Sequence, residues 1–112
     1  METKKSFEMI LTIVNSGFAD NVMDAAKSVG ANGGTVLHAR GTGIHEAEEF
    51  FGVSIQPEKD VVLILVESEN KKAIMQEIYK KAGLATEGRG MCLSVPVNDV
   101  VGIVHYDREA KL

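Results

Sequence analysis

VVLILV, residues 61–66, is the stretch that decides the fold, because every one of its side chains is apolar. A short apolar run with no polar alternate is typical of a strand at the centre of a sheet, covered on both faces. The chain has 112 residues, which is enough for one core and one domain. We therefore predict a single domain over 1–112, built around a sheet that has 61–66 in its interior.

Residues 7–14 (FEMILTIV) predict a second strand of this sheet. Apolar side chains at Phe7, Met9, Leu11 and Ile13 alternate with a partly polar set, which is the pattern of a strand with one buried face. We expect the set that begins at Phe7 to form that face.

Two helices are predicted on either side of a strand over 35–40. The first has Ser16 as its candidate N-cap and apolar residues at helical spacing up to Gly30, which suits the left-handed residue that closes a helix. The second has Ser68 as its cap and Gly83 as its stop. Its predicted apolar face consists of Ile74, Ile78 and Ala82.

The remaining segments complete a βαββαβ order. Residues 91–95 predict a strand, 101–105 predict a short extra strand at the C-terminal edge, and the acidic stretch 44–60 predicts a functional or mobile loop. The order indicates an α+β, ferredoxin-like sandwich with both helices on one face of the sheet. Since 61–66 is apolar on both sides, the sheet face without helices should also be buried, and another subunit is the simplest way to bury it.

Composition excludes several classes of function. The net charge is -4 and no Lys/Arg cluster exceeds a pair, so nucleic acid is not an expected partner. Cys92 is the single cysteine, which rules out an intrachain disulfide and favours a buried or half-buried thiol in a reducing compartment. No signal-peptide pattern and no membrane-length apolar run occur, so we expect a cytoplasmic protein without membrane insertion.

Four glycine- and valine-containing motifs occur in a characteristic order: GGTV at 33–36, RGTG at 40–43, GRG at 88–90 and VPV at 95–97. In order and spacing they resemble the P-II family of signalling proteins, trimeric regulators of bacterial transport and nitrogen metabolism. The chain looks like a divergent branch of that family with a shortened T-loop.

The resemblance implies a homotrimer with adenine-nucleotide sites in the clefts between subunits. Glycine loops suit phosphate binding because backbone N–H groups can approach the oxygens with no Cβ in the way. The loop over 44–60 would then contact a partner, a membrane transporter or an enzyme. The residues implied for the nucleotide are Thr35, Gly41, Thr42, Gly43, Gly88, Arg89 and Gly90, and those implied for the effector or partner loop are His45, Glu46, Phe50 and Phe51.

The departures from the family pattern concern the effector. Met91, Gly102 and Val104 stand where the family has cations that clamp a triphosphate, although Arg89 supplies one replacement charge. AMP and ADP are therefore at least as plausible as ATP. The loop has no tyrosine, and His45 replaces the family glutamine, so 2-oxoglutarate sensing is unsupported.

We therefore predict a non-enzymatic regulator that has an adenine nucleotide as its effector and no tightly bound cofactor. The alternative is a trimeric ferredoxin-like metal-tolerance protein that binds divalent cations, although no i, i+4 histidine pair supports a metal site. Phe50 and Phe51 either dock on a partner or fold back on their own subunit. Gly90→Glu is expected to abolish nucleotide binding while leaving the fold intact.

Overall fold

The computed structural model describes residues 5–41, 48–50, 53–55, 57–86 and 90–103. Its elements in chain order are β1 (Phe7–Asn15), α1 (Ala19–Ser28), β2 (Thr35–Arg40), β3 (Glu48–Phe50), β4 (Val53–Ile55), β5 (Glu58–Glu67), the 3₁₀ helix η1 (Ser68–Asn70), α2 (Lys71–Lys81) and β6 (Gly90–Val97).

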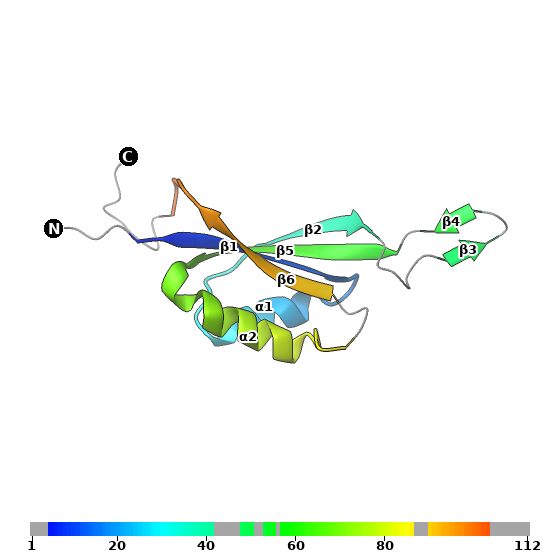
Figure 1. Cartoon of the computed structure of the whole chain (residues 1–112), viewed down its shortest axis with the longest axis horizontal. Coiled ribbons are helices and arrows are strands. Elements are labelled where there is room, and N and C mark those ends of the chain that lie inside the picture. The colour runs from blue at the N-terminus through cyan, green and yellow to red at the C-terminus, as the bar shows by residue number, and fades with distance from the viewer. Residues whose placement is uncertain (1–4, 42–47, 51–52, 56, 87–89, 104–112) are drawn as a thin grey trace.

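Four strands form the main sheet in the order β2-β5-β1-β6, and every neighbouring pair is antiparallel (Figure 1). β5, which contains 61–66, lies in the interior between β2 and β1, as the sequence predicts. With the small β3–β4 hairpin set aside, the order is βαββαβ. The predicted α+β, ferredoxin-like sandwich is confirmed.

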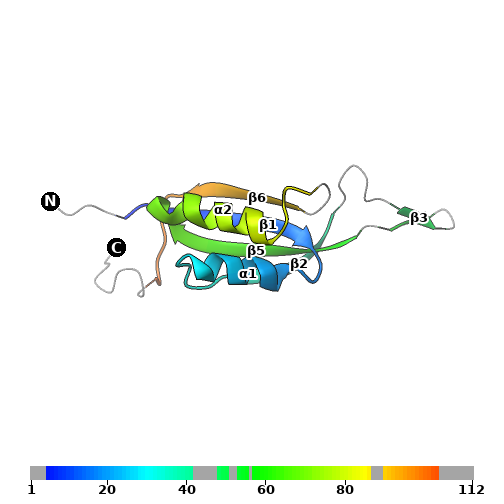
Figure 2. The same cartoon turned by 90° about the horizontal axis from the view of Figure 1, so that it is seen from below.

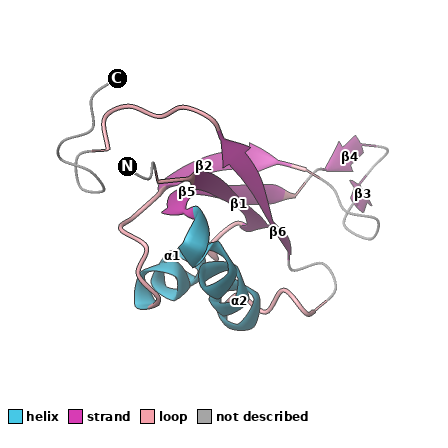
Figure 3. Cartoon of the chain, turned by 60° about the vertical axis from the view of Figure 1, so that its left-hand side comes forward, coloured by secondary structure: helices cyan, strands magenta, loops and turns pink. Residues whose placement is uncertain are grey.

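Helices α1 and α2 lie side by side on one face of this sheet (Figures 2 and 3). The core is the layer between the helices and the sheet. Its fully buried apolar side chains include Ile10 and Val14 of β1, Ile64 of β5, and Ile74 and Ile78 of α2. The predicted apolar face of α2 is therefore confirmed.

The two faces of β1 are the reverse of the sequence-based expectation. Ile10, Thr12 and Val14 are buried under the helices, whereas the set that begins at Phe7 is only half-buried on the opposite face. The expectation was wrong because the polar member of the buried set, Thr12, is small and donates its hydroxyl to the sulfur of Cys92 at 3.4 Å. A polar residue of this kind can lie in the core once it has a partner.

The glycines predicted to end the two helices are confirmed, but the residues predicted to cap their N-termini are not. Gly30 and Gly83 have φ values of +106° and +67°, so both adopt the left-handed conformation expected after a helix. The predicted N-caps are wrong. α1 follows Phe18 rather than Ser16, and Ser68 begins η1, so that α2 starts after Asn70.

β5 begins at Glu58, before the apolar run, so the connection between β2 and β5 is shorter than 44–60. This connection includes the β3–β4 hairpin, which forms a separate two-stranded sheet beyond the end of the main one (Figure 1). At the C-terminus, residues 101–103 form no strand, and the rest of the predicted edge strand lies outside the described residues.

The face of the sheet opposite the helices is apolar and partly exposed. Strand register aligns Leu11 of β1 with Leu63 of β5 and Leu93 of β6, so these side chains share that face. We call it the open face. Its most exposed large side chains among the described residues are Leu37 (48%), Met91 (56%), Leu93 (36%) and Val95 (45%).

Candidate functional site

A hollow of about 590 Å³ lies on the open face, and we call it the sheet-face hollow. Thr35, the first residue of β2, and Asn32 contribute its polar side chains. Four apolar side chains from β1, β5 and the segment after β6 line the rest: Met9, Leu63, Leu65 and Ile103. Apolar walls with a few polar groups at this volume are typical of small-molecule sites.

The turn that leads into Thr35 lies close against β5. A Cβ added at Gly34 would be 2.6 Å from the carbonyl oxygen of Leu63 and 2.9 Å from Cγ1 of Ile64. Gly33, with φ of +151°, also lines the sheet-face hollow. The two glycines before Thr35 therefore bring the main chain to the wall of the hollow, where a larger residue at position 34 would not fit.

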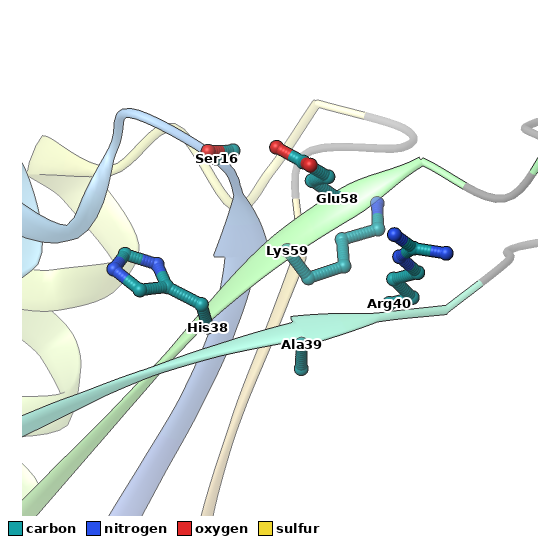
Figure 4. Close-up of a pocket in the computed structure, with 6 residues that line it drawn as sticks. All are labelled: Ser16, His38, Ala39, Arg40, Glu58 and Lys59. Carbon is teal, nitrogen blue, oxygen red and sulfur yellow. The ribbon is translucent and has the colours of Figure 1, made fainter.

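A second hollow, of about 470 Å³, lies at the other end of β2, and we call it the loop-root hollow. Its side chains come from the ends of β2 and β5 and from the turn after β1 (Figure 4). Positive and negative groups are mixed here. The lining residues are Ser16, His38, Ala39, Arg40, Glu58 and Lys59.

Asp60 lies beside the loop-root hollow and is 4% exposed. Its Oδ2 accepts a hydrogen bond from the backbone N–H of Gly17 at 3.0 Å, and its Oδ1 is 2.9 Å from Nδ1 of His38. The bond from Gly17, followed by the bond from His38, lowers the pKa of Asp60 and outweighs the opposing effect of burial. The carboxylate is therefore ionised and fixed in place at neutral pH.

Strand register places Gly90 on the same row of the sheet as Asp60. Gly90 pairs with Val14, which pairs with Asp60, which pairs with His38. Gly41 directly follows β2, so it lies at the same end of the sheet. The described parts of the two glycine loops, 40–41 and 90, are thus at one end, while Thr35 lies further along β2.

Gly90 has no room for a side chain. It has a φ of +143°, and an added Cβ would overlap the carbonyl oxygen of Ile13 on β1. The expectation that Gly90→Glu leaves the fold intact is therefore wrong, because any side chain here would displace one of two paired strands.

The other predicted site residues lie outside the described residues: Thr42, Gly43, His45, Glu46, Phe51, Gly88 and Arg89. Phe50 ends β3, but its side chain also lies outside the description. The alternatives for Phe50 and Phe51 stay open. Of the family's cation positions, Met91 follows Gly90 on β6 and is exposed, and Gly102 has a φ of +89°.

Sequence reasoning missed most of the residues that line the two hollows. Asn32 and Ile103 are separated by most of the chain, so no local pattern connects them. The sequence gives only a weak indication that Lys59 and Asp60 belong to a site, because they are two charged residues directly before an apolar strand. Lys59 is only 7% exposed and donates to Oδ1 of Asn15 at 2.6 Å.

Cys92 is half-buried on β6, as the sequence predicts. Burial raises the pKa of its thiol, an effect that the hydrogen bond with Thr12 opposes. The neutral thiol is the stable form at neutral pH, so Cys92 behaves as a packing residue.

Within the described ranges, no three His, Cys, Asp or Glu side chains are grouped so that they could hold a metal ion. Nothing in the described structure therefore favours the metal-tolerance alternative. Neither described α-helix has the length and apolar content of a membrane span.

An antiparallel four-stranded sheet with two helices on one face defines a ferredoxin-like domain. Residues 7–106 match the family model described as nitrogen regulatory protein P-II. The chain belongs to the P-II family. Proteins of this family are trimeric signalling proteins that bind adenine-nucleotide effectors and partner proteins.

Among solved structures, the chain is similar to PII of Arabidopsis thaliana bound to citrate, with 24% sequence identity and a TM-score of 0.70. The match covers 89% of this chain and 85% of the plant protein. No curated protein matches the sequence. The structural similarity supports the fold, and the family model shows that the chain belongs to the P-II family.

Proposed function

We propose that this chain is a homotrimeric, non-enzymatic regulator. An adenine nucleotide binds in clefts between its subunits, and the segment between β2 and β5 transmits the bound state to a cytoplasmic partner, a transporter or an enzyme. The observation that carries this proposal is the sheet-face hollow at Thr35 in a member of the P-II family.

The shape and chemistry of the sheet-face hollow suit a purine base. Met9, Leu63 and Leu65 offer apolar surface for the face of a ring. The Thr35 hydroxyl and the Asn32 amide can exchange hydrogen bonds with the polar edge of the ring. A base held between an apolar wall and two polar side chains is oriented as well as buried.

The open face supports the trimeric part of the proposal. Leu37, Met91, Leu93 and Val95 are large apolar side chains left exposed on one face of a single chain. Apolar surface of this kind marks an interaction site. Subunits packed over the open face would leave the sheet-face hollow at their boundary, which supports a shared cleft.

Gly41 is six residues from Thr35 along β2, about 20 Å, so the phosphates of a nucleotide held at Thr35 would meet the glycine loops of the neighbouring subunit in the shared cleft. Backbone N–H groups of the two glycine loops, with Arg89, are the proposed phosphate ligands. Because Met91 and Gly102 are uncharged, fewer side-chain cations are available than in the family pattern, which favours AMP or ADP over ATP.

Titration calorimetry with AMP, ADP and ATP tests the ligand, with cyclic dinucleotides and bicarbonate as competing candidates. We expect AMP or ADP to bind most tightly, and Thr35→Val to weaken binding by roughly threefold to tenfold because one hydrogen bond is lost. Tyr79→Phe is the matched control, since it removes a hydroxyl from an exposed residue of α2. Absence of adenine-nucleotide binding at millimolar concentration would refute the proposed ligand.

Light scattering tests the assembly. We expect a mass three times that of the 12.1 kDa chain. A monomer would refute the shared-cleft mechanism.

A further inference from the structure

The turn between β1 and α1 is fastened to the first residues of β5 by side-chain and main-chain bonds. The N–H of Ser16 donates to the carbonyl oxygen of Glu58 at 3.2 Å, and the N–H of Gly17 donates to Asp60 at 3.0 Å. Lys59 donates to Asn15 at 2.6 Å. Each of the first residues of β5 thus has a partner in residues 15–17.

Asp60 extends this connection to β2. Its second carboxylate oxygen bonds to Nδ1 of His38, so that one nearly buried side chain joins the turn, β5 and β2. A buried carboxylate is costly unless it is hydrogen-bonded, and here each oxygen has a donor.

These bonds lie at the root of the segment 42–56. The N–H of Gly41 donates to the carbonyl oxygen of Pro57 at 3.3 Å, which closes the two ends of that segment on each other. His38 and Asp60 are each three residues from this closure, one on either strand.

We propose that Asp60 is a positioning residue that holds both ends of the segment 42–56 to the turn between β1 and α1, so that the root of the segment and helix α1 move as one unit. Its regulatory meaning rests on the proposed function, in which that segment contacts the partner. A displacement of the root on partner binding would then reach α1, which packs on the core.

Two observations separate Asp60 from an ordinary surface ion pair. The carboxylate is buried although its partner His38 has an 86% exposed side chain. The lowered pKa of Asp60 also keeps the carboxylate ionised across the pH range in which histidines titrate. The remaining charged side chains around the loop-root hollow are Arg40, Glu58 and Lys59.

Amide hydrogen exchange on the full chain without nucleotide tests this role. In Asp60→Ala we expect the Gly41 amide, which does not contact Asp60, to exchange at least about tenfold faster relative to the buried strand residue Ile64. Glu69→Ala removes an exposed carboxylate at the opposite end of β5 and should leave that ratio unchanged. Equal acceleration at Gly41 and Ile64, or none, would show that Asp60 does not position the root.

Asp60→Asn adds a test that a purely stabilising role would not pass. The asparagine oxygen can still accept from the N–H of Gly17, and its amide group can donate to an unprotonated Nδ1 of His38, so both connections are kept. We expect this variant to keep the Gly41 to Ile64 ratio of the wild type, and a ratio as high as that of Asp60→Ala would contradict the proposal.

Neither measurement uses nucleotide or partner. A chain that binds no adenine nucleotide but shows these exchange patterns would refute the proposed function and leave the role of Asp60 intact.

Discussion

At the scale of single residues, Gly90 belongs both to a loop motif and to a tightly paired strand. The GRG motif at 88–90 suggests phosphate binding, but in the described structure a side chain at position 90 would overlap the carbonyl oxygen of Ile13, so strand packing alone already requires glycine there. A glycine in a nucleotide motif is therefore not by itself evidence of ligand contact.

Gly90→Ala should destabilise the protein by about 1–3 kcal/mol, because the added methyl overlaps the backbone of β1 and the residue has a positive φ. Urea denaturation measures this loss. Gly41→Ala is the control, since a Cβ at Gly41 meets no described atom within 4 Å, and it should change stability by less than about 0.5 kcal/mol. Comparable losses in the two variants would disprove the packing explanation.

Asp60 makes stability depend on acid pH. Its folded-state pKa is lowered, so its contribution is present above the unfolded-state pKa of about 3.9 and is lost as the pH falls through the folded-state value. The unfolding free energy of the wild type should therefore fall more between pH 7 and pH 3 than that of Asp60→Ala. Parallel pH profiles from denaturation experiments would rule out this contribution.

At the scale of elements, the sequence correctly predicts those helix and strand features that depend on neighbouring residues alone. The apolar spacing of α2 and the left-handed glycines at 30 and 83 are local, and both predictions are confirmed. The start of β5 was missed because Glu58, Lys59 and Asp60 are polar, and only partners distant in sequence make a strand of them. Thr35 was identified through the family pattern, but the walls of its hollow converge from several segments that no single stretch predicts.

Ile78→Ala should cost about 2–5 kcal/mol, because Ile78 of α2 is fully buried between the helix and the sheet. Tyr79→Ala tests the adjacent position of the same helix, where the side chain is 53% exposed, and should cost less than about 1 kcal/mol. Thermal or urea unfolding distinguishes the two. Similar losses would mean that α2 does not pack as described.

At the scale of the whole molecule, the two faces of the sheet have different tasks. The helix-covered face holds the core, and the open face presents Leu11, Leu63 and Leu93 as one apolar row. The reversed faces of β1 follow from this division, because both faces need apolar side chains when one contacts helices and the other is the proposed subunit contact. Strand periodicity alone cannot say which face is which.

Leu93→Asp should convert the proposed trimer to a folded monomer, because a carboxylate would be buried in the subunit contact without a partner. Light scattering reports the mass and circular dichroism reports the retained fold. Tyr79→Asp places the same charge on the helix side and should leave the trimer intact. A trimeric Leu93→Asp variant would argue against the open face as the subunit contact.

The bond between Gly41 and Pro57 has one further consequence. A segment whose ends meet at one point can change in length and composition at little cost to the scaffold, since doubling a loop adds only about 0.6 kcal/mol of closure entropy. Residues 44–56 should therefore be exchangeable between related proteins. Under the proposed function, such an exchange should transfer the choice of partner, while a host that keeps its own Gly41, Thr42 and Gly43 keeps these nucleotide ligands.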